Sequence, residues 1–136
     1  MNWLSKSDTM HTRRSSLNDS VFKIKTEKNL EERLLYSQTL MRKYPDRVPV
    51  IVEKNPECVQ LQSIERTKYL VPRELSVAQF IQMLRKHVKL DSSMAIFVLI
   101  NNKLIPNTAT ISEVYATEKE EDGFMYVIYS LENTFG

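Results

Sequence analysis

Residues 123–136 read GFMYVIYSLENTFG, and the apolar part of this stretch decides the fold. Successive side chains of a strand point to opposite faces of the sheet. The two faces would carry Phe124, Tyr126 and Ile128 on one side and Met125, Val127, Tyr129 and Leu131 on the other. Both faces are apolar, which is typical of a central strand that is covered above and below. We therefore expect this strand in the middle of a sheet, with packed layers on both sides.

The same stretch ends in a short polar tail, and its last residue, Gly136, is one of only 2 glycines in the chain. A terminal glycine offers a carboxylate with no β-carbon beside it, which can enter a narrow enzyme channel with little steric obstruction. The tail is therefore a candidate handle for another enzyme. A glycine left there by chance or by trimming is the alternative, and residue chemistry alone leaves both open.

Length and composition place the chain among ordinary single-domain proteins. It has 136 residues, of which 42% are hydrophobic and 26% charged, a balance typical of soluble domains. No run approaches the ~18 apolar residues that would span a bilayer, and residues 1–16 lack the apolar core of a secretory signal. The single cysteine, Cys58, cannot form an internal disulfide. We therefore expect a reducing compartment, with the cytosol as the default.

The basic charge gathers at the N-terminal end. Residues 1–29 carry 6 basic and 3 acidic side chains, giving +3, whereas the rest of the chain carries 13 basic and 14 acidic, giving −1. Because the first twenty or so residues are polar without a sustained period, residues 1–21 are predicted to be a flexible basic extension. Such an arm could contact a membrane, tubulin or nucleic acid, but a solvated polar arm is the commoner explanation.

Three helices are predicted by their caps. In a capping box, a Ser, Thr or Asn side chain and a Glu or Gln three residues later each cap the backbone of the other. The pairs here are Asn29 with Glu32, Ser76 with Gln79, and Thr110 with Glu113. The second helix is the best supported, because an apolar face follows its cap: Val77, Phe80, Ile81, Leu84 and Val88.

Strands are predicted over residues 47–54, 66–72, 95–100 and 123–131, which are rich in β-branched and aromatic side chains. Pro49 cannot donate to a ladder, so it should face a bulge or an unpaired edge. The element order is helix, strand, strand, helix, strand, short helix, strand. This is the order of an α+β, ubiquitin-like β-grasp roll, with a mixed four-stranded sheet, a central helix and an N-terminal helical extension. The extension would cover the second apolar face of the sheet.

No cluster of residues indicates catalysis. His11 lies in the arm, His87 is expected to be a partly packed helix residue, and Cys58 a structural thiol. The sequence shows no phosphate-binding glycine loop and no metal-ligand spacing. We therefore predict no enzyme activity, no catalytic residue, no cofactor and no metal.

Surface recognition is the remaining class of function. If residues 66–72 form an edge strand, their open backbone groups can accept an extended peptide as one more strand. The alternative is that Tyr69, Leu70 and Val71 belong to the core, and periodicity alone leaves both open.

Five motifs in order resemble the autophagy-related protein eight family of ubiquitin-like modifiers. They are RVPVIVEK at 47–54, TKYLVP at 67–72, SVAQFIQMLRKHVKL at 76–90, ISEVYATEKEEDGFMYVIY at 111–129 and TFG at 134–136. The resemblance covers about residues 22–136. The sequences EDGF and TFG are nearer the microtubule-associated protein light chain three branch than the GABA-receptor-associated branch, although the connection after Asn102 resembles the shorter form of the latter.

The resemblance implies that Gly136 is joined to the amine of phosphatidylethanolamine, after adenylation and thioester transfer by separate activating and conjugating enzymes. A processing cysteine protease would cleave after Gly136, and Phe135 would enter these partner enzymes with it. Residues 22–131 would form the ubiquitin-like domain, including an N-terminal helical subdomain, and residues 132–136 a free conjugation tail. A chain that ends in this glycine would be the mature form, cytoplasmic and, when lipidated, on the autophagosomal membrane.

The resemblance also implies that cargo receptors and adaptors bind through a short aromatic-x-x-aliphatic motif added to strand 66–72. The aromatic pocket would comprise Leu40, Pro49, Ile51, Lys68, Leu70 and Phe124. The aliphatic pocket would comprise Tyr69, Val71, Pro72, Phe80, Met83 and Leu84. Acidic residues flanking the motif would contact Lys28, Arg66 and Lys68.

Three positions depart from the family pattern: Glu27 and Lys28 stand where an arginine pair is usual, and His87 where an arginine is usual. A different class of function stays open as the alternative. It is an unconjugated ubiquitin-like interaction domain that docks on the cytoskeleton, for example tubulin, or on a scaffold protein through its basic arm. No nucleic-acid partner is expected.

Overall fold

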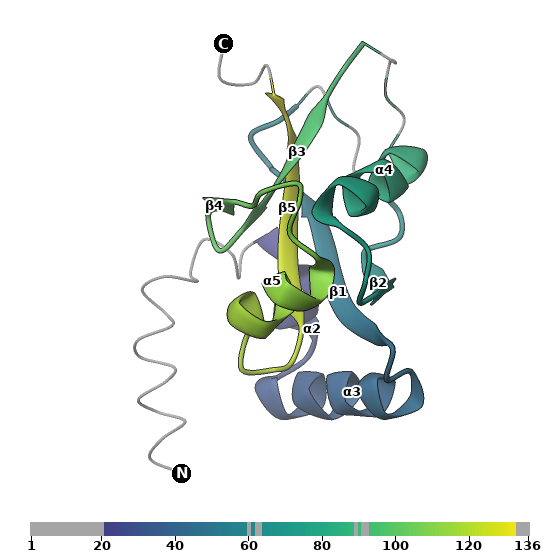
Figure 1. Ribbon diagram of the computed structural model, residues 1–136. Helices are drawn as coiled ribbons and strands as arrows, with labels where there is room; N and C mark the ends of the chain where they lie inside the picture. The colour runs from purple at the N-terminus through teal and green to yellow at the C-terminus, as the bar shows by residue number, and fades with distance from the viewer. Residues whose placement is uncertain (1–20, 60, 62–63, 89, 91–92, 133–136) are drawn as a thin grey trace.

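A computed structural model describes residues 21–59, 61, 64–88, 90 and 93–132 (Figure 1). The predicted basic arm up to residue 20 and the tail residues Phe135 and Gly136 lie outside these described residues. The helices are α2 (Lys23–Glu27), α3 (Leu30–Lys43), α4 (Val77–His87) and α5 (Ile111–Glu118). The strands are β1 (Arg47–Lys54), β2 (Lys68–Pro72), β3 (Ile96–Ile100), β4 (Lys103–Leu104) and β5 (Met125–Leu131).

The described strands form one five-stranded sheet in the order β2-β1-β5-β3-β4. β1 and β5 pair in parallel, with Val50 opposite Met125, while β2, β3 and β4 pair antiparallel to their neighbours. The sheet is therefore mixed, its first and last strands meet in parallel, and β5 lies at the centre. This arrangement confirms the predicted α+β roll.

The two faces of β5 separate two apolar clusters, as its alternating side chains predict. Met125, Val127, Tyr129 and Leu131 belong to the main core, which includes Phe80 and Leu84 of α4 and Ile111 of α5. Phe124 and Tyr126 belong to a second cluster with Phe22, Ile24 and Ile51, and Tyr36 and Leu40 of α3 pack against it. Thus α4 and α5 cover one face of the sheet, and α2 and α3 cover the other (Figure 1).

All three predicted capping boxes are present. Asn29, Ser76 and Thr110 each accept a hydrogen bond from the backbone N–H three residues later, and the Glu or Gln at that position accepts from the cap backbone. Tyr44 is the C-cap of α3, directly before Pro45. Helix starts could be located from sequence because these bonds are local.

The sheet differs from the predicted four strands because a two-residue strand, β4, extends it. Asn101 and Asn102 have φ of 52° and 62°, and they connect Ile100 to its partner Lys103. Positive φ at both loop residues is the geometry of a tight hairpin turn that matches strand twist, and Asn tolerates it. Unlike β5, β3 is not fully covered on both faces, since Phe97 and Leu99 are only half-buried. The second cluster draws its strand residues from β1 and β5.

A buried polar clasp ties α3 to the loop before β5. Asp122 is 1% exposed, and its carboxylate accepts from Arg33 Nε at 2.9 Å, from the Phe124 backbone N–H at 2.9 Å and from the Tyr126 hydroxyl. Its backbone carbonyl accepts from Ser37 Oγ at 2.5 Å. A buried carboxylate is tolerated when it is paired and hydrogen-bonded in this way. The clasp thus fixes the helix that borders the candidate site.

Candidate functional site

β2 is an edge strand whose outer backbone groups face away from the sheet. Val52 N–H donates to Thr67 O at 2.8 Å and Arg73 N–H to Asp46 O at 3.1 Å. Hydrogen-bonded pairs alternate along an antiparallel ladder. The backbone groups of Tyr69 and Val71 therefore face β1, and those of Lys68, Leu70 and Pro72 face outward.

Within the described residues β1 is the only strand neighbour of β2. One outward carbonyl already has a side-chain partner, since Arg47 Nη1 donates to Leu70 O at 3.2 Å. The remaining outward groups can pair with an extended peptide. The edge position on which the peptide-binding prediction depends is therefore present.

Pro49 shows why a proline fits in β1. It lies opposite Leu70 in a pair that is not hydrogen-bonded to β2, so its missing N–H is not needed there. On the other side, the ladder with β5 begins only at Val50. Pro49 therefore faces an unpaired position, as expected for a proline inside a strand.

The six residues predicted for the aromatic pocket share one face of the sheet. Pro49 lies opposite Leu70, and Ile51 lies opposite Lys68, so alternation puts these four side chains on the α3 side. Ile51 and Phe124 are in the second apolar cluster, and Leu40 packs against it, which completes the set: Leu40, Pro49, Ile51, Lys68, Leu70 and Phe124.

Tyr36 also borders this set, although it is not among the pocket residues predicted from sequence. Its ring packs edge-on against Phe124, with 5.7 Å between centroids, and Lys68 Nζ lies 5.6 Å from the Tyr36 centroid. The signal was available, because Tyr36 lies four residues before Leu40 and thus on the same helix face.

The residues predicted for the aliphatic pocket divide into core and surface. Val71, Phe80 and Leu84 are 0–1% exposed and Tyr69 is 7% exposed, so these four belong to the main core. Pro72 and Met83 are half-buried. The alternative interpretation as core thus holds for Tyr69 and Val71, whereas Leu70 is half-buried on the opposite face. A ligand on this side would meet Pro72 and Met83 first.

Tyr69 has an unusual environment at the edge. Its hydroxyl is buried and has no hydrogen-bond partner among the described residues. Its ring lies 5.9 Å from the Arg66 guanidinium and packs edge-on against His87, with 5.7 Å between centroids. Burial raises the pKa of Tyr69, and the Arg66 charge opposes the shift. The ring therefore stays neutral at physiological pH.

The three cations predicted to receive acidic flanks do not converge. Arg66 lies over Tyr69, and Lys68 lies over Tyr36, on opposite faces of the sheet. Lys28 is the C-cap of α2, and its carbonyl accepts from Arg33 Nη1 at 2.7 Å.

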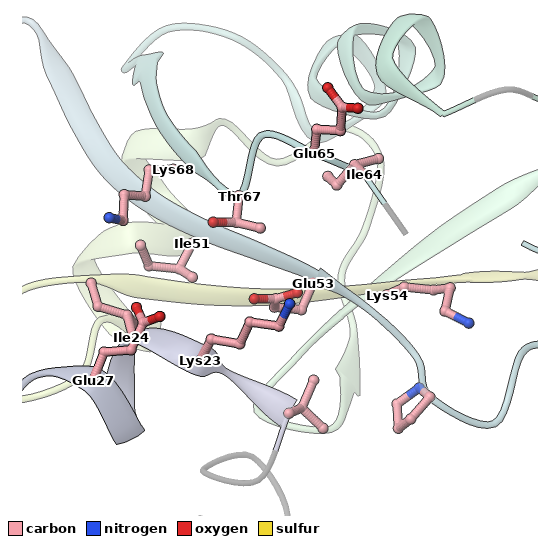
Figure 2. A pocket seen from close by; sticks show the side chains of 12 residues that line it. Lys23, Ile24, Glu27, Ile51, Glu53, Lys54, Ile64, Glu65, Thr67 and Lys68 are labelled. Carbon is pink, nitrogen blue, oxygen red and sulfur yellow. The ribbon is translucent and has the colours of Figure 1, made fainter. Parts of the chain in front are cut away.

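A cavity of about 650 Å³ lies instead beside Lys68, between α2 and the ends of β1 and β2 (Figure 2). Its charged lining consists of Glu27, Glu53, Glu65, Lys23, Lys54 and Lys68. Burial raises the pKa of Glu53, and the nearby Lys23 lowers it only in part. This cavity was not among the sites predicted from sequence, although Glu53 follows Ile51 by two residues on one strand face.

The described residues contain no group of three or more His, Cys, Asp or Glu side chains that could hold a metal ion. Among the same residues, no helix combines the length and apolarity needed to cross a bilayer.

Comparisons with known proteins agree on one family. The family model described as "Autophagy protein Atg8 ubiquitin like" matches residues 32–136. Autophagy-related protein 8c of Arabidopsis thaliana is 48% identical over 112 residues, covering 82% of this chain and 93% of the relative. Autophagy-related protein 8a of the same plant is 48% identical over 117 residues, covering 86% and 93%.

A solved structure supports the same assignment. The crystal structure of Trypanosoma brucei ATG8 superposes with a TM-score of 0.77 at 37% identity, covering 81% of this chain and 94% of that one. Together with the family match, this likeness shows that the fold is ubiquitin-like. The names of these relatives do not separate the light chain three and GABA-receptor-associated branches, so the branch stays a prediction.

Proposed function

Because the chain belongs to the Atg8 family of ubiquitin-like autophagy proteins, we propose that it is conjugated through Gly136 to phosphatidylethanolamine. Its role as a ubiquitin-like modifier in autophagy follows from the family; the lipid and the tail chemistry are the proposal. Phe135 and Gly136 are the residues that an activating enzyme, a conjugating enzyme and a processing cysteine protease would handle. The protein itself is the acyl donor in this chemistry, and the catalytic groups belong to its partners.

The buried position of β5 supports this use of the tail. Tyr129 and Leu131 are 0–1% exposed, and the Glu132 N–H that follows donates to Ala95 O at 3.1 Å. The strand is therefore anchored up to the last described residue. The four residues 133–136 could extend about 13 Å beyond that anchor at ~3.3 Å per residue. A tail of this reach would present the terminal carboxylate to a partner enzyme while the domain stays folded.

Conjugation is tested by incubating the chain with the two enzymes, ATP and liposomes that contain phosphatidylethanolamine. Wild-type protein should float with the liposomes after a salt wash, and mass spectrometry should find an amide on Gly136. Gly136→Ala should give little product, whereas Asn133→Ala, in the same tail, should be conjugated like wild type. Equal conjugation of wild type and Gly136→Ala would refute the assignment.

We further propose that the β2 edge binds cargo receptors and adaptors through an aromatic-x-x-aliphatic motif. The observation that carries this is the edge itself, where the backbone groups of Lys68, Leu70 and Pro72 face outward beside an apolar surface. The aromatic side chain would lie among Ile51, Leu70 and their neighbours. The aliphatic side chain would rest on Pro72 and Met83, above the buried Tyr69, Val71, Phe80 and Leu84. Acidic flanks would meet Arg66 or Lys68.

Peptide binding is tested by titrating the chain with a motif peptide and following backbone amide shifts. Shifts should concentrate at Lys68 and Leu70, and a peptide with alanine at both anchor positions should cause none. Removal of residues 1–20 tests the alternative function as well. Peptide binding that survives this removal supports the edge, whereas loss of all partner binding would favour a scaffold domain that works through its arm. The protein would act in the cytoplasm and, once lipidated, on the autophagosomal membrane.

A further inference from the structure

The cavity beside Lys68 continues the proposed aromatic pocket. Ile51 and Lys68 belong to the predicted aromatic pocket and also line this cavity (Figure 2). A peptide on the β2 edge would therefore pass from one into the other. We propose that this cavity receives the side chain two residues before the aromatic residue of a bound motif, and that it selects lysine or arginine there. The inference rests on the proposed peptide-binding function and adds a position-specific preference to it.

The order of the two pockets sets the direction of the peptide. The aromatic residue comes first in the motif and would lie near Lys68, at the start of β2, while the aliphatic residue would lie near Pro72, at its end. The peptide therefore runs parallel to β2. Residues before the aromatic position must then pass Thr67 and Glu65, and both of these line the cavity.

Strand periodicity identifies which upstream side chain enters. Ile51 lies opposite Lys68, and Glu53 follows Ile51 by two residues on the same face of β1. Two residues advance a strand by about 6.6 Å on the protein and on the peptide alike. The side chain two positions before the aromatic residue therefore lies beside Glu53, just as the aromatic side chain lies beside Ile51.

The charges of the cavity favour a cation. Three carboxylates line it, those of Glu27, Glu53 and Glu65, and none has an ion pair within 4.0 Å in the part of the chain that the structure describes. Burial disfavours the ionised form of Glu53 and raises its pKa; Lys23 offsets part of this, and repulsion from Glu27 adds to it. A basic side chain placed between these carboxylates would offset both effects.

Two of the three lysines that line the cavity interact elsewhere, so they do not fully supply the positive charge that its carboxylates favour. Lys54 Nζ donates to Cys58 O at 2.9 Å, and Lys68 Nζ lies over the Tyr36 ring at 5.6 Å. Lys23 is the one that points toward Glu53 (Figure 2). Around Glu53, two carboxylates, its own and that of Glu27, thus act against one ammonium, that of Lys23. Its apolar lining, including Ile24 and Ile64, can cover the stem of a lysine or arginine.

A preference for an acidic peptide residue belongs instead at the position directly before the aromatic residue. Arg66 does not line the cavity, and its guanidinium lies over Tyr69, on the other face of the sheet. Because peptide side chains alternate, the residue directly before the aromatic one faces Arg66. The flank rule that follows is acidic at the first upstream position and basic at the second.

The test uses one motif peptide with alanine, lysine or glutamate at the second upstream position, titrated into the full chain by fluorescence anisotropy. Relative to alanine, lysine should lower Kd about two- to fivefold, as expected for a partly exposed ion pair, and glutamate should raise it. Lysine moved to the first upstream position should give no gain. Added salt should shrink the lysine preference.

Protein variants make the assignment specific. Glu53→Gln keeps the side-chain shape and should abolish the lysine preference, whereas Glu57→Gln, which is exposed and outside the cavity, should keep it. Far-UV circular dichroism checks that both variants are folded. Equal Kd for the alanine and lysine peptides, or an unchanged preference in folded Glu53→Gln, overturns this inference and leaves the proposed function standing. Failure of the alanine peptide to bind folded wild type overturns both.

Discussion

Gly123→Ala tests how tightly the loop before β5 is held against α3. Gly123 has φ of +84°, and a β-carbon built there would lie 2.3 Å from Ser37 Oγ. An alanine with positive φ costs roughly 1–2 kcal/mol by its backbone alone. The clash adds a second cost, because Ser37 Oγ would have to leave the Asp122 carbonyl, which it binds at 2.5 Å. Leaving a buried carbonyl without its partner costs about 1–3 kcal/mol.

We therefore expect Gly123→Ala to lower the free energy of unfolding by about 2–5 kcal/mol. This is a large share of the 5–15 kcal/mol typical of a domain. The measurement is equilibrium unfolding in urea, followed by the fluorescence of the tyrosines and by circular dichroism. Unchanged slopes against urea would show that the midpoint shift reports stability.

A double-mutant cycle with Ser37→Ala separates the two costs. Ser37→Ala removes the Oγ that clashes, so Gly123→Ala should cost less in that background, with only the backbone strain and the 3.1 Å approach to the Ser37 β-carbon remaining. The reasoning is refuted if Gly123→Ala costs under about 0.5 kcal/mol, or if its cost is the same with and without the Ser37 hydroxyl.

Three further perturbations test the clasp and the site. Asp122→Ala should cost about 3–5 kcal/mol in urea unfolding because it removes the ion-pair partner of the mostly buried Arg33 and the acceptor of the buried Tyr126 hydroxyl. Its exposed neighbour Glu121→Ala should stay within about 0.5 kcal/mol. Leu70→Ser should weaken binding of a motif peptide at least about fivefold without unfolding the domain. The control, Leu104→Ser on the opposite edge of the sheet, should bind the peptide normally. An equal loss of binding in both variants would exclude the β2 edge as the binding site. Burial raises the pKa of Glu53 above its unfolded value, so ionisation of Glu53 in the folded state opposes folding. Stability is therefore lost as pH rises from the unfolded pKa through the higher folded pKa. Glu53→Gln should therefore be more stable than wild type at pH 7, with the difference vanishing below the unfolded pKa near 4.5, and a constant difference at all pH values would contradict the electrostatic cause.

Sequence alone predicted the features that depend on local periodicity and local bonds. The alternation along β5 predicted the central strand and both of its faces, because a period of two needs no knowledge of the neighbours. The capping box of Ser76 and Gln79 predicted where α4 starts, because its bonds span three residues. The sequence predicts that β2 starts at Arg66, whereas the strand starts at Lys68, because β propensity does not show where pairing begins.

Features that depend on distant contacts could not be predicted from sequence. Asp122 ends an acidic run that reads as a solvated segment, yet it is 1% exposed because Arg33 lies 89 residues away in the chain and 2.9 Å away in space. Glu120 pairs in the same way with Lys25, 95 residues away, at 2.6 Å. The cavity at Glu53 likewise forms only when α2 packs over the end of β1. No local sequence pattern indicates such long-range pairings.

β5 joins the proposed aromatic pocket to the proposed conjugation tail. Phe124 precedes its first residue and lies in the proposed aromatic pocket, while Leu131 is its last residue and leads to the tail. The strand has 7 residues, so these points are separated by about 23 Å, and β5 ends at the side of the molecule opposite α3 (Figure 1). A chain attached to a bilayer through its tail would thus hold its receptor pocket away from the lipid. Because β5 is packed on both faces, the core fixes the distance between the pocket and the tail. The apolar residues on both faces of this strand therefore support both proposed activities, peptide binding at one end and lipid conjugation at the other.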